Sequence, residues 1–123
     1  MPPHRQPTIS THVLDNERGQ PAVGVHVTLE RRHGDAFTTL ASATTDDDGR
    51  VASLLPGQLQ AGIYRIVFDA AGYFAGQDPA AGEGDSVPFL RTVAIEFQIT
   101  DTGRHYHVPL LMTRFACTSY RGS

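Results

Sequence analysis

Apolar and polar side chains alternate along much of the chain, which is the pattern of strands with one buried face. Between residues 23 and 30, valine and leucine alternate with glycine, histidine, threonine and glutamate. Successive side chains of a strand project to opposite faces, so the apolar members of this segment are expected to face a core. The same pattern predicts further strands over residues 9–14, 63–68, 92–99 and 106–112. The segment 37–45, rich in threonine and small residues, is predicted to be an edge strand.

Residues that tolerate turn dihedrals separate these segments. They gather at 15–19, 46–49, 56–57, 82–85 and 101–103. Short strands punctuated by such turns are typical of an antiparallel sandwich. The one helix expected, over Ala70–Gln77, is short because its small residues give it little surface to bury. We therefore predict an all-β fold, a two-sheet sandwich of about eight strands with one short helix.

The length of 123 residues suits one domain. Hydrophobic residues make up 40% and charged residues 19%, a balance typical of a folded chain. No apolar run approaches the roughly 20 residues that a membrane-spanning helix needs. Residues 1–7 lack the apolar stretch of a secretory signal, and we expect them to form a flexible lead before a domain over residues 8–123.

Charge excludes several classes of function. The chain has 10 basic and 13 acidic residues, a net charge of −3, and the basic residues are scattered arginines rather than the basic stripe of a nucleic-acid-binding protein. The absence of lysine excludes a Schiff base and a Walker-type phosphate loop. The single cysteine, Cys117, excludes an internal disulfide framework and predicts a reducing compartment, the cytoplasm.

Two segments have partial metal-binding patterns. His105 and His107 are two apart on a predicted strand, so their side chains project from one face, and His12 is a candidate third ligand for a zinc hydrolase. Packed or solvated histidines are the simpler interpretation. The acidic run at 46–49 resembles half of a calcium loop, but Leu55 stands where such a loop closes with glutamate, which favours a turn.

The remaining chemistry is that of water activation. A neutral histidine takes a proton from water near neutral pH, and a guanidinium stabilises a carbonyl oxygen that becomes an oxyanion. His12, Arg50 and His107 have these chemistries, although their spacing alone does not bring them together.

Four ordered motifs resemble those of one family. The last four residues, 120–123, are Tyr-Arg-Gly-Ser, and the segments 9–15, 45–50 and 104–111 read Ile-Ser-Thr-His-Val-Leu-Asp, Thr-Asp-Asp-Asp-Gly-Arg and Arg-His-Tyr-His-Val-Pro-Leu-Leu. Together they resemble the 5-hydroxyisourate hydrolases, the transthyretin-like proteins of purine catabolism. The resemblance extends over residues 8–123, nearly the whole chain.

The resemblance implies a transthyretin-like sandwich in which the first, fourth, seventh and eighth strands share a sheet. It places His12 on the first strand, Arg50 at the start of the fourth, His107 on the seventh, and residues 120–123 at the end of the eighth. It also implies a homotetramer, a dimer of dimers, with the sites at the dimer–dimer interface.

The implied reaction is hydrolysis of 5-hydroxyisourate to 2-oxo-4-hydroxy-4-carboxy-5-ureidoimidazoline, a step of urate degradation that opens a cyclic amide without a metal or organic cofactor. His12 and His107 are expected to activate water, and Arg50 to bind the substrate carbonyls. Three residues of the terminal motif are expected to complete the site. Ser123 is a further catalytic residue, and Arg121 and Tyr120 bind substrate.

Two other functions remain as alternatives. Transthyretin itself carries a hormone on the same fold without catalysis, so a non-catalytic small-molecule carrier is the main one. A structural or adhesive sandwich module is the other, because turns such as the one at 46–50 also occur in such modules. The terminal motif and the two site histidines favour the hydrolase.

Overall fold

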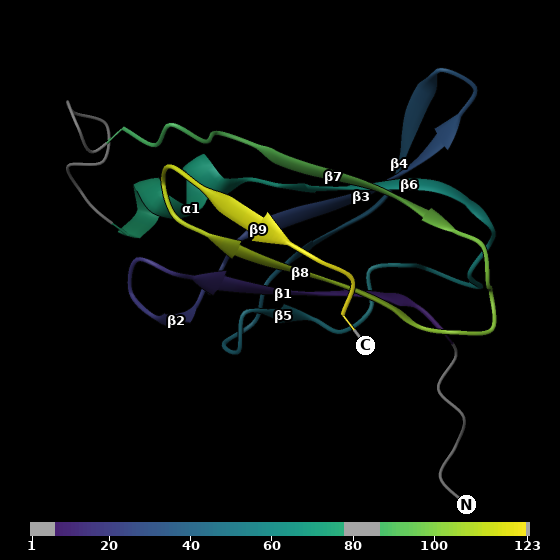
Figure 1. Cartoon of the computed structure of the whole chain (residues 1–123), viewed down its shortest axis with the longest axis horizontal. Helices are drawn as coiled ribbons and strands as arrows, with labels where there is room; N and C mark the ends of the chain where they lie inside the picture. Colours follow the sequence, from purple (N-terminus) through teal and green to yellow (C-terminus); the bar gives the residue numbers. More distant parts are fainter. Residues whose placement is uncertain (1–6, 78–86, 123) are drawn as a thin grey trace, which may run out of the picture.

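The fold is known from a computed structural model, which describes residues 7–77 and 87–122. Two sheets face each other, and one short helix lies at one end of the pair (Figure 1). The first sheet has the order β2 (Gln20–Pro21), β1 (Ile9–Asp15), β8 (Tyr106–Met112) and β9 (Cys117–Ser119), and β5 (Arg50–Val51) also pairs with β1. The second sheet has the order β4 (Ala36–Thr44), β3 (His26–His33), β6 (Gly62–Phe68) and β7 (Val93–Ile99).

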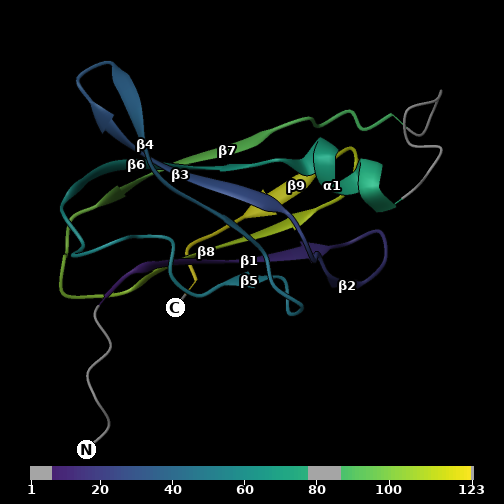
Figure 2. The ribbon, with the colours of Figure 1, turned by 180° about the vertical axis from the view of Figure 1, so that it is seen from behind.

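The strand pairs are antiparallel, except that β1 and β8 run parallel at the centre of the first sheet. The hairpin of β3 and β4 projects from the sandwich at the end away from the helix α1 (Ala70–Gln77), as the view from behind also shows (Figure 2). No helix among the described residues is long and apolar enough to cross a membrane.

The core lies between the two sheets. Each sheet contributes its apolar phase, so that the inward side chains of both are almost completely shielded from solvent. Fully buried members include Val13, Leu29, Ile66, Phe68 and Leu110. Burial of this apolar surface is the main stabilising contribution to such a fold, and it leaves the opposite face of the first sheet available for polar residues.

The predicted sandwich with one short helix is confirmed, and the helix has the predicted bounds. The strand predicted from residue 23 begins instead at His26, because Gly24 adopts a left-handed φ of 84° and turns the chain, leaving Val23 45% exposed. The chain also forms two strands of two residues each, β2 and β5, which are too short to be predicted from alternating apolar and polar residues. Residues 1–6 of the expected flexible lead and the predicted turn at 82–85 lie outside the described residues.

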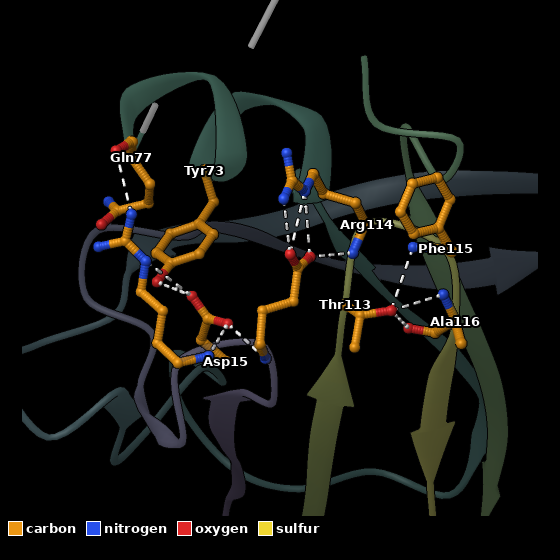
Figure 3. Close-up of polar contacts among 9 residues, drawn as sticks. Asp15, Tyr73, Gln77, Thr113, Arg114, Phe115 and Ala116 are labelled. Carbon is orange, nitrogen blue, oxygen red and sulfur yellow. Dashed lines mark hydrogen bonds and ion pairs between the residues drawn. The ribbon is translucent and has the colours of Figure 1, made fainter. Parts of the chain in front are cut away.

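A buried carboxylate holds α1 against the first sheet (Figure 3). Asp15, 1% exposed at the end of β1, accepts a 2.7 Å hydrogen bond from the Tyr73 hydroxyl of the helix. Its other oxygen accepts the backbone N–H groups of Glu17 and Arg18 at 2.9 and 3.2 Å. Glu17 in turn pairs with Arg114 of the β8–β9 turn. The sheet is therefore tied together at the end that carries the helix.

Candidate active site on the outer face of the first sheet

Three neighbouring strands carry the predicted catalytic side chains on one face. His12 of β1 pairs with Arg50 of β5, and Ser10 of β1 pairs with His107 of β8. Paired residues project to the same face of a sheet, and residues two apart on a strand do so as well. The fold therefore places His12, Arg50 and His107 on one face of the first sheet, and Arg50 and His107, but not His12, line a common cavity there.

The alternation of the strands turns this group away from the core. On β1, the two residues that flank His12, Thr11 and Val13, are buried. On β8, Val108, which follows His107, is buried as well. His12 and His107 are half-buried, and Arg50 is exposed. Polar groups at such positions are accessible to a small molecule from solvent.

A cavity of about 430 Å³ opens on this face. Its walls come from β1, β5, β8 and the segments beside them. The lining residues are Ser10, Thr11, Arg50, Val51, Ala52, His105 and His107. The cavity is large enough for a small heterocyclic ligand.

The environment of His107 favours the neutral imidazole. Burial is the main cause that lowers the pKa of His107 below its usual 6.5, and electrostatic interactions with Arg50, His105 and His12 lower it further. A neutral imidazole beside a guanidinium is suited to hold or deprotonate water and to stabilise negative charge on a carbonyl oxygen.

A tight turn presents Arg50 to this face. Asp46 Oδ1 accepts the backbone N–H groups of Asp48 and Arg50, both at 2.9 Å. Gly49 has a left-handed φ of 74°, and a Cβ there would lie 2.5 Å from the Val13 carbonyl oxygen. The Asp46 carboxylate thus caps backbone N–H groups, in agreement with the prediction of a turn rather than a calcium loop.

The C-terminal segment returns to His107 from the side of β9. The Gly122 N–H donates to the His107 carbonyl at 2.8 Å, and the Arg121 guanidinium lies over the Tyr106 ring, 4.7 Å from its centroid. Arg121 and Tyr120 line a second cavity, of about 270 Å³, that His107 also borders. Tyr120 is 59% exposed. Ser123 lies outside the described residues.

Sequence reasoning gave no role to two residues that contact His107. The Ser10 hydroxyl lies 2.7 Å from His107 Nδ1, and a Cβ at Gly122 would lie 2.5 Å from His107 Cδ2. Ser10 stands two residues before His12, on the same face of the predicted strand, which was an available signal. Gly122 is part of the terminal motif, but nothing in the sequence says which side chain its backbone approaches.

The described residues, 7–77 and 87–122, do not form the zinc site considered as an alternative. No three histidine, cysteine, aspartate or glutamate side chains of these residues come together to hold a metal ion. His105 Nε2 and His107 Nδ1 instead lie 2.8 and 2.7 Å from the same Ser10 hydroxyl.

Known proteins are similar to this chain in sequence and in fold over nearly its whole length. The 5-hydroxyisourate hydrolase of Deinococcus radiodurans is 45% identical over 119 residues, which cover 95% of this chain and 97% of that protein. The structure of Klebsiella pneumoniae 5-hydroxyisourate hydrolase matches with a TM-score of 0.76 and 36% identity, over 94% of this chain and 99% of that one.

A thyroxine-binding protein has the same architecture. The structure of sea bream transthyretin in complex with thyroxine matches with a TM-score of 0.80 and 29% identity, over 93% of each chain. The model of the HIUase/Transthyretin family matches residues 9–122. The chain therefore belongs to the HIUase/transthyretin family.

Proposed function

We propose that this protein hydrolyses 5-hydroxyisourate to 2-oxo-4-hydroxy-4-carboxy-5-ureidoimidazoline, a step of urate degradation. The observation that carries the proposal is that a half-buried His107, whose pKa is lowered, and the guanidinium of Arg50 line the same cavity. The choice of 5-hydroxyisourate as the substrate rests on the 45% identity to a 5-hydroxyisourate hydrolase.

The proposed reaction opens a cyclic amide with water. His12 and His107 position the water and one of the two takes its proton, the water oxygen attacks the carbonyl carbon, and the proton passes to the ring nitrogen as its bond to carbon breaks. Arg50 holds the carbonyl oxygen and stabilises its negative charge in the transition state. Because the guanidinium polarises the carbonyl, this mechanism requires neither a metal nor an organic cofactor.

The C-terminal segment is proposed to complete the site. Arg121 and Tyr120 would contact substrate through the cavity that they share with His107. Ser123 is assigned to the catalytic group on the family motif alone, since it follows Gly122 directly.

The proposed assembly is a homotetramer with its sites at the dimer–dimer interface. An outer sheet face that carries half-buried histidines and an open cavity supports this proposal, because a partner face would close the cavity and exclude water. We also propose a cytoplasmic location, which the exposed, unpaired thiol of Cys117 favours.

The test follows the ultraviolet decay of 5-hydroxyisourate generated fresh by urate oxidase. Wild type should accelerate the decay with and without a chelator, and Arg50→Ala should lose about 100-fold or more of kcat/KM, the usual cost of removing an oxyanion partner. Arg32→Ala is the matched control, because that arginine lies on the β3–β4 hairpin and donates to the Gly34 carbonyl. Decay at the spontaneous rate with folded wild type would overturn the proposal in favour of a carrier.

A further inference from the structure

A chain of hydrogen bonds reaches His107 from outside the proposed catalytic group. The backbone N–H of Thr8 donates to His105 Nδ1 at 3.3 Å, and His105 Nε2 lies 2.8 Å from the Ser10 hydroxyl oxygen. The same oxygen lies 2.7 Å from His107 Nδ1. Ser10 is 8% exposed, so water competes little for its hydroxyl.

The direction of these bonds follows from which groups are able to donate. A backbone N–H only donates, so His105 Nδ1 accepts, and the single proton of a neutral His105 is then on Nε2, from which it is donated to Ser10. The hydroxyl hydrogen of Ser10 is left for His107 Nδ1, because the hydroxyl has no third partner among residues 7–77 and 87–122. The neutral ring of His107 therefore carries its proton on Nε2.

We propose that Ser10 and His105 are positioning residues that hold His107 in the Nε2–H tautomer and fix the plane of its ring. His107 then presents an N–H donor to the cavity, and its Nδ1 is occupied. In the proposed hydrolysis this ring therefore positions water or substrate, and His12 takes the proton. This inference rests on the proposed hydrolysis, in which His107 contacts water or substrate, and it adds two residues that act through His107 without touching the reacting atoms.

The same chain disfavours a charged His107. An imidazolium donates through both nitrogens, so Ser10 would receive hydrogens from both His105 and His107 and its own hydrogen would lose its acceptor. The titratable groups that face His107 are Arg50 from β5, His12 from β1, and His105 from the segment before β8, and each lowers the pKa of His107 electrostatically. Hydrogen bonding and charge thus favour the same neutral ring.

The experiment combines ¹⁵N-imidazole NMR with kinetics on the full chain at pH 7.5. Wild-type His107 should show the Nε2–H tautomer. His105→Leu removes the donor to Ser10, so the Nδ1–H form should appear and kcat should fall about tenfold or more with KM little changed, as for other orienting partners of catalytic histidines. His105→Gln keeps an N–H group near the position of Nε2 and should retain the tautomer and most of kcat.

Two further variants complete the design. Ser10→Ala should reproduce the tautomer change of His105→Leu, and His33→Gln, at an exposed position on the β3–β4 hairpin, should change neither readout. An Nδ1–H tautomer in wild type, or equal activity of the Leu and Gln variants, would overturn the inference. If wild type shows the Nε2–H tautomer but does not hydrolyse 5-hydroxyisourate, the proposed function fails while the positioning network stands.

Discussion

Gly122 lies against the imidazole edge of His107. A Cβ at position 122 would come within 2.5 Å of His107 Cδ2 and 3.1 Å of Cγ, although the two residues are joined by a backbone hydrogen bond of 2.8 Å. The backbone bond holds Gly122 in place, and the ring lies where a side chain would project. Gly122 thus supports one side of a ring whose Nδ1 is held by Ser10.

Gly122→Ala is expected to displace the His107 ring while leaving the sandwich folded. The added methyl group overlaps the ring, so either His107 leaves Ser10 or the terminal segment moves away. An error of about 1 Å at a catalytic group costs roughly 100-fold in rate, and we expect a loss of kcat of that order. The decay assay measures it, and thermal unfolding checks that the fold persists.

Gly76→Ala is the matched control, because a Cβ there meets nothing within 4 Å and the residue lies in α1. It should leave kcat unchanged and stabilise the fold by up to about 1 kcal/mol, since alanine favours helix over glycine. Unimpaired kcat in Gly122→Ala would show that the ring position is not critical.

The acid limb of the rate profile should report His107. Its pKa is lowered mainly by burial and then by Arg50, so more than half of the His107 rings are still neutral at pH 6.5. If His107 works as a neutral ring, kcat/KM should fall on the acid side with its half-point below pH 6.5. A pH series of the decay assay, corrected for the spontaneous rate, measures the apparent pKa.

Arg50→Gln tests the assigned cause. Removing the guanidinium charge relieves repulsion on the imidazolium, so the pKa of His107 should rise toward its usual value while remaining below it because of burial. NMR titration of the ring gives this shift even if the variant is inactive. A lower or unchanged pKa in Arg50→Gln would contradict the electrostatic account.

Periodicity was sufficient for the sandwich because most of its strands bury one face. The alternation around Val13, Ile66 and Leu110 follows directly from an inward phase, and the strand at 106–112 was predicted with the bounds it has. The same reasoning placed the start of one strand too early. Apolar residues on both sides of Gly24 continue the alternation, but the positive φ of Gly24 turns the chain, and the strand begins only at His26. Two-residue strands such as β5 are too short for any period.

The site was accessible to sequence reasoning only through the family motifs. Residues 12, 50 and 107 are far apart in the chain, and they meet because β1 has β5 on one side and the parallel strand β8 on the other. Strand order of this kind is a long-range property that local patterns do not contain. Ser10 was missed for a related reason, since its partners His105 and His107 lie 95 and 97 residues away.

Activity should depend on protein concentration if the site needs a partner face. Below the dissociation constant of the proposed tetramer, the activity per protomer should fall in parallel with the loss of tetramer, because an open cavity admits bulk water. Sedimentation velocity and the decay assay over the same dilution series measure both quantities. A monomer with full specific activity would contradict the proposed interface site.

The contact between Asp15 and Tyr73 should stabilise the fold. Tyr73→Phe removes the 2.7 Å bond to a carboxylate that is 1% exposed and leaves one of its oxygens without this donor. Leaving a buried acceptor unsatisfied costs about 1–3 kcal/mol, so the free energy of unfolding measured with urea should fall by that amount. Burial and the bond to Asp15 both raise the pKa of Tyr73, so the phenol remains a donor throughout the accessible pH range.

The comparison variant for this contact is Tyr120→Phe, because the Tyr120 side chain is 59% exposed. Loss of its hydroxyl should change the free energy of unfolding by no more than about 0.5 kcal/mol. A double variant separates the hydrogen bond from the loss of packing. Asp15→Ala with Tyr73→Phe should be destabilised by less than the sum of the single variants, because each change removes the same bond. Strict additivity would mean that the two side chains stabilise the fold independently and that this bond does not hold α1 to the sheet.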